Sequence, residues 1–196
     1  ENREFASAIE AWAGLGSSKL YIGSYEISYY QYLYPYNNYH ILLDNFKYFK
    51  EFGGNYIYPE GTWENMNNPG FAKLRDYINS KGMFDVNSDY NELVDKFFKY
   101  YFREAAPVMR KYFNEVQVNL TINENITGGR VHSYGLSDNR VWPEALVTGW
   151  LNSFDVAQNE ILKYKDTDFE LYEALSKHIV IESLFPRYVL CTKYDK

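Results

Sequence analysis

The sequence predicts an α/β segment followed by an all-α segment, with helix predominating over the whole chain. In the first half, two short apolar segments are each followed by a loop and then by a helical pattern. From Ser88 onward, apolar residues recur at helical spacing. We therefore expect two consecutive βα units in residues 1–86 and a bundle of about four helices in residues 87–196.

The elements of the first half are bounded by glycine, proline and capping residues. Gly53 and Gly54 end one helix, and the pair Asn68 and Pro69 begins the next, with Gly82 as its stop. The expected elements are a helix over 2–13, a strand over 19–26, a tyrosine-rich loop over 27–39, a helix over 40–52, a strand over 55–60, a loop over 61–68 and a helix over 68–80.

Two consecutive βα units imply parallel strands that are joined by a right-handed crossover. Two strands alone do not make a stable parallel sheet, because both faces of such a sheet need cover. Residues 1–86 therefore have the pattern of the closing part of a larger sheet or barrel.

The second half has its own capping signals. Ser88 is the expected cap of a helix over 89–102, and Pro107 stands near the start of another that runs to about Leu120. Pro143 opens a third helix that continues to about residue 164, and Thr167 with Glu170 forms a capping box for a fourth. Pro186 lies within that last pattern and predicts a kink or an early end.

Composition excludes several classes of protein. A chain of 196 residues is long enough for one domain or two small ones, and its one cysteine, Cys191, cannot form an internal disulfide. The net charge of −6 argues against binding to a nucleic-acid backbone. No apolar run approaches the roughly 20 residues that span a bilayer, and we recognise no signal-peptide pattern.

The strongest compositional feature is the aromatic content: 21 Tyr, 13 Phe and 4 Trp. One interpretation is an AT-rich genome, whose codons favour Tyr. The other is a surface that stacks on sugar rings and hydrogen-bonds their hydroxyls, because tyrosine couples an apolar face to a polar tip. Composition alone does not separate the two.

Two acidic residues follow the predicted strands, where ligands of parallel sheets and barrels bind. Glu26 follows the first strand, and Glu60 follows the second within a Pro-Glu-Gly turn. A pair of carboxylates is what glycoside hydrolysis requires, one to protonate the leaving oxygen and the other to attack or to activate water. We therefore take Glu60 and Glu26 as candidate catalytic residues, although chance also places acids at strand ends.

Aromatic and acidic residues surround these carboxylates in the sequence and form the candidate substrate-binding set: Tyr25, Tyr29, Tyr34, Trp63 and Glu64. An aromatic rim with carboxylates favours a sugar over an anionic ligand, which the carboxylates would repel. No cofactor is needed for this chemistry.

The three histidines give little support to a metal site. None forms an HxH or HExxH motif, so no metal ligand is predicted. His40 and His178 fall in helical patterns, whereas His132 lies in a long polar loop, residues 128–140. That loop is either functional or a plain surface loop, and the sequence does not decide between them.

The order of motifs over residues 19–113 resembles a bacterial family catalogued as domain-of-unknown-function family 4838. The matching segments are YIGSYE, LYPY, NFKYFKEFGGNYIYPEG and FAKLRDYI. A following pattern matches Asp89, Leu93, Val94, Asp95, Phe97, Tyr100, Tyr101, Ala105, Ala106 and Tyr112.

This resemblance implies a glycoside-hydrolase-like TIM barrel followed by a helical region, with a layout similar to alpha-glucuronidases, in bacterial proteins that are secreted or stand at the cell surface. The two strands would then be the last two of eight, Glu60 would lie at the substrate cleft, and the main partners would be a carbohydrate and the missing N-terminal part of the barrel. Two alternatives remain open: a non-catalytic glycan-binding module, and a purely structural helical module.

Overall fold

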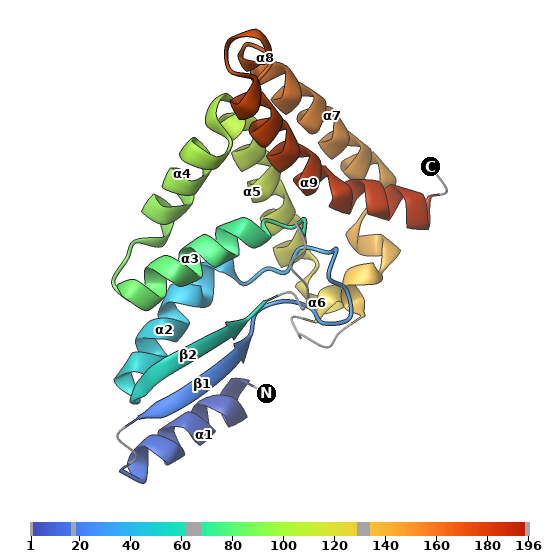
Figure 1. The fold of residues 1–196 in the computed structure, drawn as a ribbon. Coiled ribbons are helices and arrows are strands. Elements are labelled where there is room, and N and C mark those ends of the chain that lie inside the picture. Colours follow the sequence, from blue (N-terminus) through green and yellow to red (C-terminus); the bar gives the residue numbers. More distant parts are fainter. Residues whose placement is uncertain (1, 17–18, 62–67, 129–133, 195–196) are drawn as a thin grey trace.

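The structure, a computed structural model, describes residues 2–16, 19–61, 68–128 and 134–194. Figure 1 shows one two-stranded sheet with helices packed behind it and a helical region beyond it. The strands are β1 (Leu20–Tyr25) and β2 (Gly54–Glu60), and the helices are α1 (Asn2–Gly14), α2 (Leu42–Glu51), α3 (Ala72–Phe84), α4 (Tyr90–Tyr101), α5 (Ala106–Ile122), α6 (Glu124–Thr127), α7 (Glu144–Glu160), α8 (Tyr164–Thr167) and α9 (Phe169–Lys193).

The two predicted strands are present, and they pair in parallel. In the register, Tyr21 faces Tyr56, Gly23 faces Tyr58 and Tyr25 faces Glu60. Ile22 points to the opposite face and is buried in the main core. The order strand, helix, strand, helix confirms consecutive βα units, and the chain as a whole is predominantly helical. Among the described residues the sheet has only these two strands.

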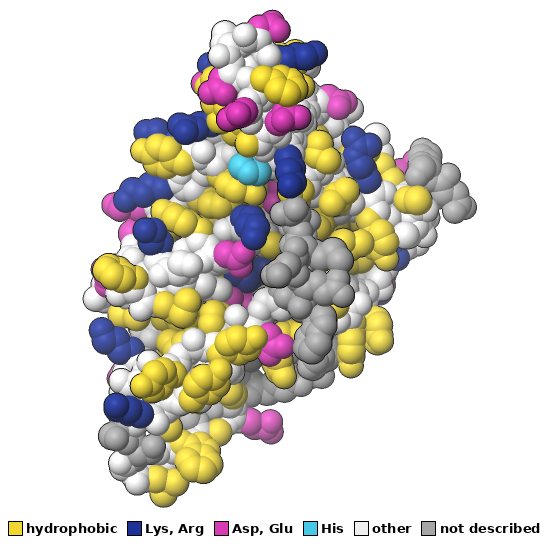
Figure 2. All heavy atoms as spheres, in the orientation of Figure 1, with side chains coloured by type: hydrophobic (Ala, Val, Ile, Leu, Met, Phe, Trp, Pro, Cys, Tyr) yellow, Lys and Arg dark blue, Asp and Glu magenta, His cyan; other side chains and the backbone are white. Residues whose placement is uncertain are grey.

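One face of this sheet is uncovered by the described residues. Helix α2 lies behind the strands in Figure 1, and α3 packs against α2. The strand face opposite Ile22 carries exposed tyrosines. Figure 2 shows a band of hydrophobic side chains across the region of the strands. The tyrosines of this face are Tyr21, Tyr25, Tyr56 and Tyr58.

Several predicted helix ends are wrong by a few residues. Helix α3 begins after Phe71, not at Pro69, and it continues through Gly82, which packs against Leu43 and Phe46 of α2. The caps of α4 and α9 are Asp89 and Asp168, whose carboxylates accept backbone N–H groups, where Ser88 and Thr167 had been expected. In both cases a neighbouring aspartate, a good capping residue, takes the role.

The later helices form the expected bundle. Helix α7 ends at Glu160 and not near residue 164, and it packs against α9 and α5. Pro186 does not end α9, but Figure 1 shows the helix changing direction along its length, as a proline inside a helix predicts. Short 3-10 turns at Gly135–Ser137 and Asn139–Val141 shape the described part of the loop 128–140. No helix in the described part of the chain is long and apolar enough to cross a membrane.

A single hydrophobic core connects the two halves. Its aromatic centre is Phe71, whose ring contacts those of Phe98, Phe102, Tyr112 and Phe113. Buried residues of the same cluster continue from α1 to α9. The segments 1–86 and 87–196 therefore share one core. Their division into two domains stays a prediction.

Glu182 of α9 ties the bundle to the turn before α3. Its carboxylate accepts the backbone N–H of Phe71 at 2.9 Å and a backbone bond from Gly70. Gly70 and Phe71 both have left-handed backbone conformations, so their N–H groups converge on one side. Burial raises the pKa of the Glu182 carboxyl to about 8, against the opposing effect of these hydrogen bonds and of Arg75.

Alanine at position 82 tests the contact between α2 and α3. A Cβ there would lie 2.6 Å from side-chain carbons of Leu43 and Phe46, whereas one at Gly149 in α7 would meet open space. Gly82→Ala should lower the free energy of unfolding by about 1–3 kcal/mol through overpacking. Gly149→Ala, the matched control, should raise it by about 0.5–1 kcal/mol. Urea unfolding measures both, and a Gly82→Ala variant as stable as the parent would contradict this packing.

Glu182→Gln tests the buried carboxyl. Between pH 4.5 and about 8 the folded chain keeps a proton on Glu182 that the unfolded chain has lost, so stability falls as pH rises through this window. The slope from this one group approaches roughly 1.4 kcal/mol per pH unit. Arg75, Tyr39, Tyr101 and Tyr112 are the charged or titratable groups coupled to it.

Glutamine keeps an acceptor for the Phe71 N–H but does not titrate. The variant should therefore show a flatter dependence of unfolding free energy on pH than the parent over the same window. Identical slopes for the two proteins, measured by denaturant unfolding at several pH values, would show that Glu182 is ionised in the folded chain.

Candidate functional site

The carboxyl ends of β1 and β2 bring a carboxylate together with aromatic side chains. Tyr25 and Glu60 are direct partners in the strand register, and the backbone N–H of Glu26 donates to the carbonyl of Glu60 at 3.2 Å. The side chains of Tyr25 and Glu60 share the uncovered face, where Tyr25 is 56% exposed and Glu60 is half-buried. The sequence analysis predicts both residues near the strand ends, and their roles in catalysis and binding stay predictions.

Tyr29 completes this cluster from the loop after β1. Its ring meets the ring of Tyr25 edge-on at 4.9 Å, and its hydroxyl hydrogen-bonds the Glu60 carboxylate. The same hydroxyl lies 3.5 Å from the carbonyl oxygen of Gly61. Burial, together with the bond to Glu60 and its negative charge, raises the pKa of the Tyr29 phenol well above its usual range. Tyr29 therefore stays protonated and acts as a donor to Glu60.

Glu26 does not join this cluster, so the expectation that Glu26 and Glu60 act as a pair of carboxylates at one site is wrong. Side chains alternate along a strand, so Glu26, one residue after Tyr25, points to the opposite face. It is only 4% exposed, and its carboxylate accepts a 2.5 Å hydrogen bond from Asn79 of α3. Burial raises the pKa of the Glu26 carboxyl, against the bond from Asn79 and the charge of Arg75.

A buried polar network therefore lies behind the strand ends. The Asn38 side chain donates to the carbonyl of Glu26 at 3.0 Å and accepts two bonds from the Arg75 guanidinium, at 3.2 and 3.4 Å. Arg75 also donates to the carbonyl of Tyr36 and lies over the ring of Tyr39. This network holds the tyrosine-rich loop against α3, so its role is to position the loop.

The other predicted site residues fall elsewhere. Tyr34 is not on the rim: it is 7% exposed, and its ring packs against Trp142, Phe185 and Tyr188. Trp63, Glu64 and His132 lie outside the described residues. His178 is stacked on Tyr101 at 3.7 Å, and its Nδ1 lies 2.9 Å from the carbonyl oxygen of that residue. In the described segments, no group of three or more His, Cys, Asp or Glu could hold a metal ion.

Sequence reasoning missed Arg75, Asn79 and Glu182. Arg75 did have a sequence signal: it lies in the segment FAKLRDYI, which resembles the family pattern. Phe71 and Leu74 of the same segment are core residues. Glu182 also had a signal, because it lies three residues after Ile179 and three before Phe185, on the apolar stripe of its helix. Asn79 gave no signal, since a polar residue in a helix is normally solvated.

The fold and the site define a predominantly helical protein with a pair of parallel βα units, in which tyrosines and the Glu60 carboxylate share the uncovered face at the strand ends. The chain belongs to the family described as Domain of unknown function (DUF4838), whose model matches residues 1–114. No curated protein and no solved structure matches the chain.

Proposed function

We propose that the chain is the closing part of a glycoside-hydrolase-like protein that acts on polysaccharide or oligosaccharide, with Glu60 at the sugar cleft. The observation that carries the proposal is the cluster of Glu60, Tyr25 and Tyr29 at the carboxyl ends of two parallel strands. Ligands of parallel βα folds bind at this end of the strands. A carboxylate beside tyrosine rings suits a sugar, which offers hydroxyls and an apolar ring face.

The uncovered face of the sheet supports the barrel part of the proposal. Parallel sheets are normally buried on both faces, and two strands are too few for independent stability. Here one face carries Tyr21, Tyr56 and Tyr58, each more than half exposed. Further strands would cover this face and continue both edges. We assign these strands to an N-terminal barrel portion of the same bacterial protein, which would meet its carbohydrate outside the cytoplasm.

In catalysis Glu60 would act as the acid/base. Glu60 would transfer a proton to the glycosidic oxygen as the bond from that oxygen to the anomeric carbon breaks, and a second carboxylate would attack or activate water. Tyr29, as a donor to Glu60, would orient the carboxyl, and Tyr25 would stack on the sugar. Because Glu26 faces the buried network, the second carboxylate would come from another part of the protein.

That same orientation of Glu26 favours a second candidate function, a non-catalytic glycan-binding module. The described residues bring one carboxylate to the rim, and one carboxylate is enough to accept hydrogen bonds from sugar hydroxyls. The two candidates differ in what Glu60→Gln should do.

The test uses the complete protein that contains this chain and the hexasaccharides of xylan, cellulose, starch and laminarin as substrates. If the protein is an enzyme, Glu60→Gln should lower turnover by roughly 10²–10⁴-fold and leave affinity nearly unchanged. Glu26→Gln, the matched control on the buried face, should keep its turnover. Glycan binding without turnover in the parent would favour the binding module, and loss of turnover in Glu26→Gln but not in Glu60→Gln would contradict the site.

A further inference from the structure

A concave site lies between the tyrosine-rich loop and the C-terminal end of α9. Its volume is about 330 Å³, at the lower end of the range for small-molecule sites. The walls come from segments that are far apart in sequence. The described lining residues are Tyr30, Gln31, Tyr32, Leu33, Tyr34, Tyr134, Ser137, Tyr188, Thr192 and Lys193.

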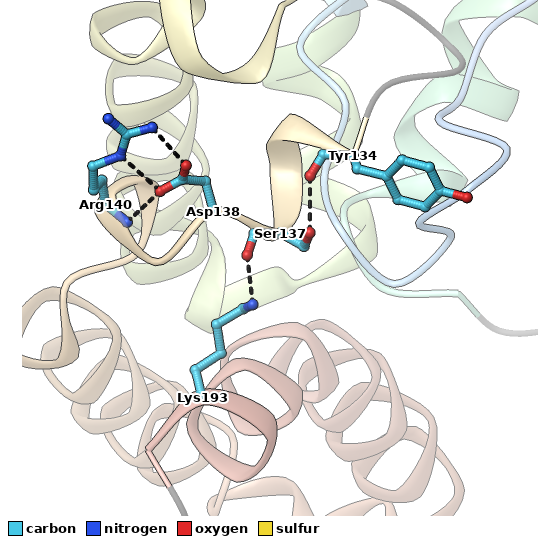
Figure 3. Close-up of polar contacts among 5 residues, drawn as sticks. All are labelled: Tyr134, Ser137, Asp138, Arg140 and Lys193. Atoms are coloured by element: carbon cyan, nitrogen blue, oxygen red, sulfur yellow. Dashed lines mark hydrogen bonds and ion pairs between the residues drawn. The ribbon is translucent and has the colours of Figure 1, made fainter.

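The wall formed by the segment 134–142 is fastened to α9. Lys193 donates to the carbonyl of Ser137, and the hydroxyl of Tyr194 donates to the carbonyl of Trp142 at 2.8 Å. Within the segment, the indole of Trp142 donates to the carbonyl of Leu136 at 2.6 Å. Figure 3 shows Lys193 reaching the 3-10 turn at Ser137, with Tyr134 projecting away from it. A wall held in this way needs little ordering when a ligand binds.

Asp138 and Arg140 stabilise this wall but do not add charge to the pocket. Arg140 donates to the Asp138 carboxylate at 2.7 and 3.0 Å, and these bonds lower the pKa of Asp138 to about 2. Figure 3 shows this pair turned away from Tyr134. Lys193 is the one charged residue among the described residues that line the pocket.

The aromatic part of the pocket is a stacked pair of tyrosines. The rings of Tyr30 and Tyr134 lie 4.7 Å apart and nearly parallel, at an angle of 14°. Both remain at least half exposed, with Tyr134 at 68%. The two rings cover each other's inner faces, so an outer face of the pair is what a sugar ring could stack on. Tyr34 of the same loop is buried and also lines the pocket.

The polar groups call for a ligand that both donates and accepts hydrogen bonds. The ammonium of Lys193 has three N–H donors, one of which is used by Ser137. Gln31 donates from Nε2 to the carbonyl of Tyr134 at 3.4 Å, and its Oε1 is buried without a partner among the described residues. The hydroxyls of Ser137 and Thr192, which also line the pocket, donate to backbone carbonyls and can still accept. A ligand hydroxyl can accept from Lys193 and donate to these oxygens, whereas a carboxylate or phosphate cannot donate.

One ring contact links the pocket to the cluster around Glu60. Tyr32 lines the pocket, and its ring lies 6.0 Å from that of Tyr29, which hydrogen-bonds Glu60. A chain of aromatic side chains therefore leads from the carboxylate to the pocket. A glycan with one sugar at Glu60 could place a neighbouring sugar beside Tyr134 and Lys193.

We propose that the pocket between Tyr30, Tyr134 and Lys193 is an additional subsite for a neutral sugar ring of the same glycan. This inference rests on the proposed function, because it takes the rim at Glu60 as the glycan site. It gives Tyr134 and Ser137, in the described part of the loop 128–140, a role in binding.

The test measures the affinity of the complete protein for maltohexaose, cellohexaose, xylohexaose and laminarihexaose by isothermal titration calorimetry. Tyr134→Ala and Lys193→Met should each weaken the binding of the preferred glycan by about tenfold, as expected for the loss of one stacking or charged hydrogen-bond contact. The matched controls are Tyr100→Ala, an exposed tyrosine on α4, and Lys177→Met, an exposed lysine on α9. Both controls should bind like the parent, and circular dichroism checks that each variant folds.

The outcomes separate this inference from the proposed function. If Tyr25→Ala weakens binding while Tyr134→Ala and Lys193→Met bind like the parent, the glycan occupies the rim alone and the subsite is wrong. If no glycan of the panel binds, both proposals are wrong. If millimolar inorganic phosphate displaces the glycan from the parent but not from Lys193→Met, the pocket is an anion site, which also overturns the inference. Weakened binding in both pocket variants, with the controls unchanged, supports it.

Discussion

The parallel register of β1 and β2 places Tyr25 directly beside Glu60 and decides which side chains reach the uncovered face. Because successive side chains of a strand alternate between faces, this register puts Tyr25 and Glu60 on one side and Glu26 on the other. A shift of one residue would exchange the two sets. The candidate site, its single carboxylate and the tyrosine face all follow from this pairing.

Residues beyond the segment that matches the family model also hold that segment in its fold. The model of the family matches residues 1–114, yet Glu182 of α9 bonds the turn before α3, and the core continues to Leu190. Phe71 is at the centre of this arrangement, since its ring packs against α4 and α5 while its backbone N–H is held by Glu182. The segment FAKLRDYI is therefore a structural motif, in which Arg75 also supports the loop after β1.

The sequence predicted the order and the type of the elements well, because apolar periodicity and the positions of glycine and proline report directly on local structure. The parallel pairing of the strands followed from the βα order. Errors arose where a long-range contact overrides a local signal. Gly82 has the local signature of a helix stop, but α3 continues through it because a residue without a side chain fits against Leu43 and Phe46.

The candidate site was predictable only in part for the same reason. Glu60 and Tyr25 follow from their positions at a strand end. Whether Glu26 faces the rim or α3 depends on the strand register and on its hydrogen bond with Asn79. Nothing in the sequence of α3 indicates that Asn79 is buried. The composition of the loop after β1 predicts Tyr34 at the rim, but the fold of that loop buries Tyr34 against Trp142 and Phe185, which are far along the sequence. The pocket at Lys193 combines three distant segments and has no local signature.

The most direct test of this account is an NMR measurement of contacts between side-chain protons at the strand ends. The register predicts nuclear Overhauser effects from the ring protons of Tyr25 and Tyr29 to the γ protons of Glu60. It also predicts effects from the side-chain amide protons of Asn79 to the γ protons of Glu26. Contacts between the Glu26 side chain and the rings of Tyr25 and Tyr29, with none from those rings to Glu60, would contradict the register and the site built on it.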